Sequence, residues 1–155
     1  MANTLATLPN LVLPATGGQE VKFAELRGAR LVLYFYPRDN TPGCTSEARD
    51  FAALHADFAA AGAALYGISR DSLASHEKFK AKLDLPFELL ADPDEAACAT
   101  FEVVKPRNMY GKQVRGIERS TFVFTADGKL ARAWRKVKVP GHAEEVLAFV
   151  RGLSS

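Results

Sequence analysis

Residues 31–44 decide how the fold is interpreted; their sequence is Leu31-Val32-Leu33-Tyr34-Phe35-Tyr36-Pro37-Arg38-Asp39-Asn40-Thr41-Pro42-Gly43-Cys44. Its first six residues are apolar or aromatic, which is typical of a central β-strand that is covered on both faces. The polar residues after them lead into residues 45–61, where apolar side chains recur at intervals of three and four, as in an amphipathic helix. The sequence therefore places Cys44 at a helix N-terminus, close behind the end of a strand.

This position of Cys44 favours a reactive thiol. Thr41 stands where an N-cap is expected, with Pro42 at the first helical position. The unpaired N–H groups and partial positive charge of a helix N-terminus stabilise a thiolate, but by only about 0.3–1 kcal/mol. Because lowering a thiol pKa by two units takes about 2.7 kcal/mol, a second positive group is needed, and composition does not identify it. The pattern alone leaves open that Cys44 is simply a small buried hydrophobe.

Strands and helices alternate along the rest of the chain. We expect strands at 11–13, 20–23, 31–36, 64–69, 87–90, 120–125 and 130–139, and helices over 45–61, 72–83, 94–101 and from 141 onward. Residues 103–118 fit neither pattern. The layout predicts one α/β domain over residues 1–155, with a mixed central sheet and helices on both faces.

Composition narrows the functional classes. The chain has 155 residues and a formal net charge of +2, which is too close to neutral to indicate a nucleic-acid partner. We find no basic leader and no apolar run of the roughly 20 residues that a bilayer span needs, so we expect a cytoplasmic protein without a membrane partner. The two cysteines lie far apart and do not form a disulfide framework, which fits a reducing compartment.

The three histidines give no metal signature. His55, His76 and His142 are scattered, and none pairs with a cysteine at a metal-binding spacing. We interpret them as surface or capping residues and expect neither a metal nor another cofactor.

Two segments carry a resemblance to a known family. Residues 34–47 closely resemble the active-site segment of the peroxiredoxins, in particular of the bacterioferritin comigratory protein (PrxQ) subfamily, whose Pro-x-x-x-Thr-x-x-Cys pattern is met by Pro37, Thr41 and Cys44. Residues 116–124 resemble the segment with the family's active-site arginine, here Arg119. Residues 89–92 and the chain length also fit, so the resemblance covers nearly the whole chain. It implies a thioredoxin-like fold and thiol-dependent reduction of hydrogen peroxide and small organic hydroperoxides.

The resemblance also implies roles for individual residues. The Cys44 thiolate would attack the peroxide, Arg119 would hold the thiolate and the developing charge, the Thr41 hydroxyl would contact the peroxide, and Pro37 would shield the sulfur. Backbone N–H groups near Gly43 would bind the leaving oxygen. We expect Glu47 either to orient Arg119 or to be an ordinary exposed acid.

The chain departs from the family in how the cysteine is recycled. Many relatives carry a resolving cysteine at the position of Arg49, and others carry it at the position of Lys80. We therefore expect a one-cysteine cycle in a monomer, with a small thiol or a thioredoxin-like protein as the reductant. Two alternatives stay open: Cys98 as a resolving cysteine, and a thioredoxin-like binding or holdase domain with an idle thiol. A cysteine hydrolase is disfavoured because no histidine lies in the local motif.

Overall fold

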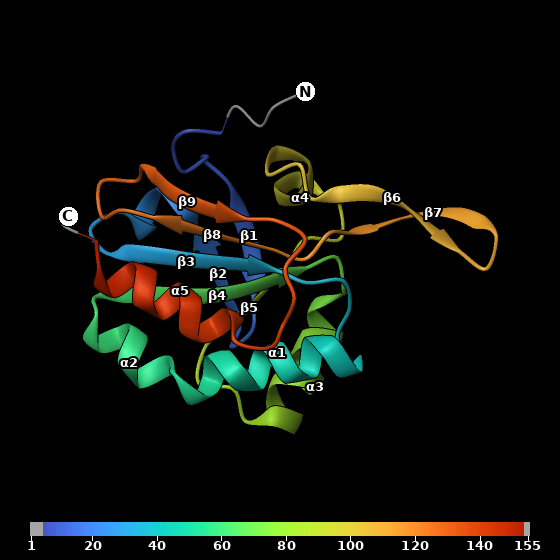
Figure 1. Ribbon diagram of the computed structural model, residues 1–155, viewed down its shortest axis with the longest axis horizontal. Coiled ribbons are helices and arrows are strands. Elements are labelled where there is room, and N and C mark those ends of the chain that lie inside the picture. Colours follow the sequence, from blue (N-terminus) through green and yellow to red (C-terminus); the bar gives the residue numbers. More distant parts are fainter. Residues whose placement is uncertain (1–4, 154–155) are drawn as a thin grey trace.

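A computed structural model describes residues 5–153, apart from the side chains of Arg107 and Met109. Within these residues the chain forms one seven-stranded mixed sheet and a separate two-stranded hairpin (Figure 1). The strand order of the large sheet is β2-β1-β5-β4-β3-β8-β9. Its strands are β1 (Val12–Ala15), β2 (Gln19–Lys22), β3 (Arg30–Phe35), β4 (Ala63–Ser69), β5 (Leu89–Ala91), β8 (Ser120–Phe124) and β9 (Leu130–Trp134).

Helices cover both faces of this sheet, as the sequence predicts. One face carries α1 (Pro42–Ala53), α2 (His55–Ala60), α3 (Leu73–Leu83) and α5 (His142–Arg151), and the other carries α4 (Ala96–Thr100) and the short 3-10 helix η1 (Phe23–Leu26) (Figure 1). The expected thioredoxin-like α/β fold is confirmed. None of the helices in residues 5–153 is long and apolar enough to cross a membrane.

The central strand β3 divides the core into two clusters. Side chains on a strand alternate between its faces, so Val32, Tyr34 and Tyr36 pack with α1, α2, α3 and α5, whereas Leu33 and Phe35 pack with α4. All of these side chains are buried. The continuous apolar run in the sequence is thus explained by a strand that is covered on both faces.

Three expected elements differ from the structure. The single helix expected over 45–61 is divided at Leu54, whose amide donates to the Phe51 carbonyl at 3.2 Å, three residues back. This turn lets Phe51 and Phe58 pack together, with ring centroids 5.8 Å apart. The strand expected over 130–139 ends at Trp134, because Lys136 adopts a positive φ of 52° that extended backbone does not allow.

Residues 103–118, which fit no pattern, form the third difference. They contain the hairpin of β6 (Val104–Met109) and β7 (Lys112–Ile117), which projects from the body as an arm (Figure 1). Tyr110 and Gly111 form its turn, both with positive φ. Most β7 side chains are exposed, so there is no buried face to create an alternating apolar pattern.

Candidate active site

The segment between β3 and α1 presents Cys44 as the sequence predicts. Pro42 is the first residue of α1, Thr41 is its N-cap, and the Thr45 amide donates to the Thr41 carbonyl at 2.9 Å. The Thr41 hydroxyl does not cap the helix, however, because it donates to the Arg38 carbonyl at 2.9 Å. Cys44 lies in the first turn, with a side chain that is buried and a thiol that is free.

Arg119 meets Cys44 at this helix start. One guanidinium nitrogen, Nη2, lies 3.5 Å from the Cys44 Sγ, and the other, Nη1, donates to the Glu47 carboxylate at 2.6 Å. A side chain at Gly43 would place its Cβ only 3.1 Å from Arg119 Nη2, so the glycine leaves room for the close approach of the arginine. The fold therefore brings together Gly43, Cys44, Glu47 and Arg119, although Arg119 is distant in sequence.

The site contains one acid in an unusual environment. Glu47 is buried, which excludes the alternative that it is an ordinary exposed acid. Burial raises the pKa of Glu47 to about 7, although the neighbouring Arg119 charge works in the opposite direction. Its second oxygen, Oε2, has no hydrogen-bond partner among the described residues. Burial disfavours the charge on Arg119, but Glu47 and Cys44 together raise the pKa of that guanidinium above its ordinary value.

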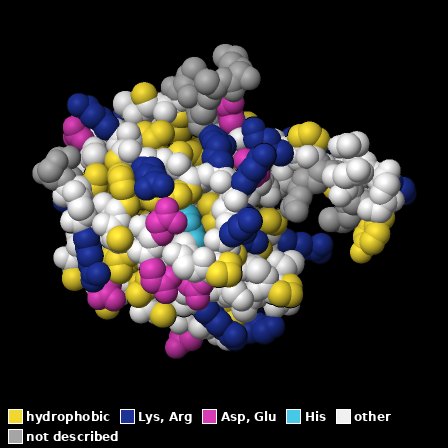
Figure 2. All heavy atoms as spheres, viewed as in Figure 1, with side chains coloured by type: hydrophobic (Ala, Val, Ile, Leu, Met, Phe, Trp, Pro, Cys, Tyr) yellow, Lys and Arg dark blue, Asp and Glu magenta, His cyan; other side chains and the backbone are white. Residues whose placement is uncertain are grey.

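A pocket of about 340 Å³ opens beside Arg119. Apolar side chains form much of its wall and two lysines flank it; the lining residues are Pro37, Lys105, Pro106, Ile117, Glu118, Arg119, Lys136 and Val137. Figure 2 shows Lys and Arg side chains on this face of the molecule between the sheet and the arm. Pro37, which we expect to shield the sulfur, lines this pocket together with Arg119.

Cys98 is placed very differently from Cys44. It lies in α4 and packs with Leu33 and Phe35, on the face of β3 opposite to the cluster that contains Cys44. Its amide donates to the Asp92 carboxylate at 2.7 Å. Burial, and then the Asp92 carboxylate, raise the pKa of the Cys98 thiol far above its ordinary value. Cys98 therefore has the environment of an inert, structural thiol.

The two positions at which relatives carry a resolving cysteine face different surroundings. Arg49 is exposed on α1. Lys80 is half-buried on α3 and forms an ion pair with Glu88 at 2.6 Å. Neither of these side chains is a hydrogen-bond partner of Cys44 or Arg119 among the described residues.

The interpretation of the histidines is wrong for two of the three. His142 is buried, and its Nε2 lies 2.8 Å from the Thr121 hydroxyl. Burial lowers its pKa to about 4, so it is neutral near neutral pH. His76 is fully buried beside Asp39, at 2.7 Å. Sequence gave no signal for this burial, because both histidines lie in helices whose packing depends on distant strands.

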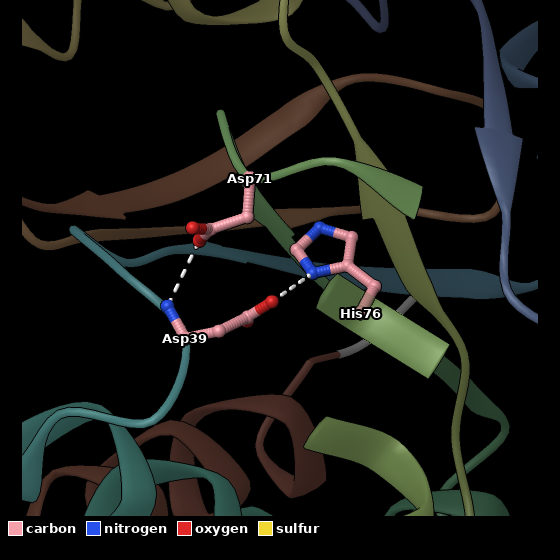
Figure 3. Close-up of side chains that lie close together, drawn as sticks. All are labelled: Asp39, Asp71 and His76. Carbon is pink, nitrogen blue, oxygen red and sulfur yellow. Dashed lines mark hydrogen bonds and ion pairs between the residues drawn. The ribbon is translucent and has the colours of Figure 1, made fainter. Parts of the chain in front are cut away.

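One group of side chains in residues 5–153 has the composition of a metal site. Asp39, Asp71 and His76 each offer a ligand atom, and these atoms lie within 4.8 Å of one another (Figure 3). Hydrogen-bond donors already occupy the carboxylates, however: Tyr36, Ser69 and Ser75 donate hydroxyl protons to them, and the Asp39 amide donates to Asp71. A cation would have to displace these donors, so the cluster is better suited to a network of hydrogen bonds than to a metal ion.

Comparison with known proteins assigns the chain to a family. The sequence profile of the AhpC/TSA family matches residues 5–133. A peroxiredoxin Bcp of Xanthomonas campestris pv. campestris is 50% identical over 155 residues, covering 97% of both chains, and one of Bacillus subtilis is 45% identical over 146 residues, covering 94% and 93%. A solved structure of Xanthomonas campestris peroxiredoxin Q superposes with a TM-score of 0.92 at 49% identity and covers 99% of both chains.

The chain therefore belongs to the AhpC/TSA family. Its similarity to the Bcp and PrxQ proteins over nearly its full length identifies it further as a peroxiredoxin, a thiol-dependent peroxidase. The resemblance stated from residues 34–47 and 116–124 is confirmed at this level.

Proposed function

We propose that Cys44 is the nucleophile that reduces hydrogen peroxide and small organic hydroperoxides, with Arg119 as its electrostatic partner. The observation that carries this assignment is the 3.5 Å approach of Arg119 Nη2 to the Cys44 sulfur at the start of α1. Among the described residues, none of the hydrogen bonds of Cys98 comes from a cation; its amide donates to Asp92. One solved relative, the Xanthomonas campestris bacterioferritin comigratory protein, has alkyl peroxide reduction activity, which supports the same substrate class.

The reaction needs no group beyond the thiol and the peroxide. The thiolate sulfur attacks one peroxide oxygen, the O–O bond breaks, and the other oxygen leaves with the electron pair as hydroxide or alkoxide. Sulfur becomes a sulfenic acid, and the leaving oxygen takes up a proton. A free thiol is already a few per cent ionised at neutral pH, so full ionisation adds little more than about tenfold in rate. Most of the acceleration must come from positioning and from stabilising the charge that develops along the O–O bond.

The surrounding residues supply that stabilisation. Arg119 has one nitrogen at the sulfur and a second on Glu47, so Glu47 fixes the plane of the guanidinium. The Thr41 hydroxyl donates its hydrogen bond to the Arg38 carbonyl, so its oxygen lone pairs can accept a hydrogen bond from the peroxide O–H. Backbone N–H groups at Gly43 and Cys44 are unpaired at the helix start and can bind the leaving oxygen. Pro37 lines the pocket and limits access of water.

We further propose that recycling follows a one-cysteine cycle. An external thiol attacks the Cys44 sulfenic acid and releases water, and a second thiol reduces the mixed disulfide. A Cys44–Cys98 disulfide would need the two Cα atoms within about 7 Å, whereas the two side chains pack on opposite faces of the sheet. The pocket beside Arg119 is open enough for a small thiol or for the exposed cysteine of a thioredoxin-like protein. A monomer in the cytoplasm fits this cycle, since glutathione- and thioredoxin-type reductants keep thiols reduced there.

The test is intact-mass analysis after one equivalent of peroxide, with and without a thiol trap. The proposal expects wild type to gain one oxygen, trapped as a sulfenic acid on Cys44, and expects Cys44→Ser to fold normally but consume no peroxide. Cys98→Ser should turn over at the wild-type rate with the same external thiol. An intramolecular disulfide in wild type, together with lost turnover in Cys98→Ser, would establish the two-cysteine alternative. Peroxidase activity retained in Cys44→Ser would overturn the assignment of the nucleophile.

A further inference from the structure

A polar cluster, buried at three of its five residues, adjoins the segment that leads to Cys44. It consists of Tyr36, Asp39, Asp71, Ser75 and His76, and is called the Asp39 cluster below. Figure 3 shows the Asp39 side chain directed at His76 on α3 and its backbone nitrogen directed at Asp71, which follows β4. Nothing in the proposed reaction uses these groups, although they join the Cys44 segment to two other elements.

Hydrogen bonding fixes where the protons of His76 lie. Its Nε2 lies 2.9 Å from the Leu90 carbonyl oxygen, which only accepts, so Nε2 carries a proton. Its Nδ1 lies 2.7 Å from Asp39 Oδ2. The Asp39 carboxylate also accepts the hydroxyl protons of Tyr36 at 2.6 Å and of Ser75 at 2.8 Å. A carboxyl that accepts from every side is ionised, and Nδ1 must then bring a proton of its own.

The charges around the ring agree with this assignment. Burial works against the charge on Asp39, but the hydrogen bonds from His76 and Tyr36 hold its pKa below its ordinary value. Asp71 adds a second carboxylate within 4.8 Å of the ring nitrogen and the Asp39 oxygen. Tyr36 stays neutral, since burial and the neighbouring Tyr34 and Asp39 raise its pKa well above its ordinary value. Among the described groups at the cluster, two carboxyl groups thus surround one histidine ring whose nitrogens both face acceptor oxygens.

We propose that the Asp39–His76 ion pair is a positioning device for the Cys44 reaction. Asp39 lies midway between Pro37 and Thr41, and it is anchored twice: by its carboxylate to His76 and by its amide to Asp71 at 2.8 Å. Asn40, the next residue, has a positive φ of 65°, a conformation that asparagine tolerates, so the segment turns sharply directly after this double anchor. Releasing Asp39 would let both the Pro37 wall of the pocket and the Thr41 start of α1 move. This inference rests on the proposed role of Cys44.

The experiment compares His76→Gln with the matched control His55→Gln. His55 is half-buried at the start of α2 and lies outside the Asp39 cluster. In folded His76→Gln we expect the second-order rate of Cys44 with hydrogen peroxide to fall at least about tenfold, and the rate with iodoacetamide to fall less than about threefold. Alkylation needs only an accessible thiolate, whereas peroxide reduction needs aligned partners, so a general loss of stability would not produce this split. His55→Gln should leave both rates unchanged.

Two further measurements keep the inference testable if His76→Gln does not fold. Ser75→Ala removes one donor to Asp39 without leaving an unpaired charge, and it should lower the peroxide rate several-fold while alkylation stays constant. In wild type, ¹H–¹⁵N NMR at about pH 7.5 should show protons on both ring nitrogens of His76. A single ring proton, or a peroxide rate within twofold of wild type in folded His76→Gln or in Ser75→Ala, would overturn the inference. Failure of the proposed function would instead appear as wild type that peroxide does not oxidise at Cys44.

Discussion

Replacing Glu47 by glutamine tests how the buried acid beside Arg119 is charged. Glutamine keeps the size of the side chain and still offers an oxygen to Arg119 Nη1, which lies 2.6 Å from the present carboxylate. What it removes is a carboxyl whose pKa burial raises from 4.5 to about 7. A carboxyl with a higher pKa in the folded state binds its proton more tightly when folded, so its contribution to stability is full below pH 4.5 and is lost as the pH rises through about 7.

The size of this effect follows from the shift in pKa. A difference of about 2.5 units corresponds to roughly 3 kcal/mol between the protonated and ionised limits, and to about 2.5 kcal/mol between pH 5 and pH 8.5. With urea slopes of about 1–3 kcal/mol per molar, wild type should lose about 1–2.5 M in its unfolding midpoint, relative to Glu47→Gln, over this pH interval. The stability of the variant relative to wild type should therefore rise toward the alkaline end.

Urea denaturation of reduced protein at the two pH values measures this difference directly. Glu20→Gln, at an exposed acid on β2, is the control, and its pH dependence should follow wild type. Because glutamine can still anchor the guanidinium, Glu47→Gln should also retain most of the peroxide reaction, whereas Glu47→Ala should lose about tenfold or more. A difference of less than about 1 kcal/mol in pH dependence between wild type and Glu47→Gln would contradict a buried carboxyl with a raised pKa, and so would a variant that is relatively less stable at high pH.

The remaining predictions concern the cation, the second cysteine and the rim of the pocket. Arg119→Met should slow the reaction of Cys44 with peroxide, measured by stopped flow, by at least about 100-fold. Arg119→Lys should recover little of the lost rate, because lysine lacks the planar fork that reaches sulfur and carboxylate together. A wild-type rate in Arg119→Met would refute this role of Arg119. Cys98→Ser should keep steady-state turnover but lose about 1–2 kcal/mol of stability in urea, since it places a hydroxyl in an apolar cluster; unchanged stability would contradict the structural assignment. The double variant Lys105→Gln and Lys136→Gln should slow reduction of the Cys44 sulfenic acid by the anionic thiol mercaptosuccinate several-fold more than reduction by uncharged mercaptoethanol. High salt should abolish this difference. Equal slowing with both thiols would count against an electrostatic role for the two lysines at the pocket.

The sequence predicts those parts of the site that depend on neighbours along the chain. The apolar run before Pro37 identified β3. Thr41, at the N-cap position, and Pro42 identified the start of α1. The place of Cys44 therefore followed from local rules alone. These rules concern propensity and helix ends, which act over a few residues. They also gave the position of the N-cap without showing that the Thr41 hydroxyl would bond elsewhere.

The position of Arg119 depends on a pairing that no local pattern contains. β8 runs antiparallel to β3 with Ser120 opposite Phe35, so the residue before Ser120 lies beside the residues that follow β3 and lead to Cys44. Only the resemblance of residues 116–124 to a known family pointed to it. The same limit explains the error over His76, which is buried because α3 packs against β5 and brings the ring to the Leu90 carbonyl. Polarity shows which residues can face water, but it does not show which polar residues find buried partners.

The Asp39–His76 and Glu47–Arg119 ion pairs share one arrangement. In each pair the anion, Asp39 or Glu47, belongs to the segment that carries the thiol, and the cation, His76 or Arg119, comes from an element distant in sequence. Removing a cation leaves a buried anion without its partner, which costs stability. At Arg119 the loss also takes the cation away from the Cys44 sulfur, whereas Glu47→Gln leaves the guanidinium in place to act on the thiolate. Loss of Arg119 should therefore damage the peroxide reaction more than loss of the charge on Glu47, an asymmetry that a purely structural role for this pair does not produce.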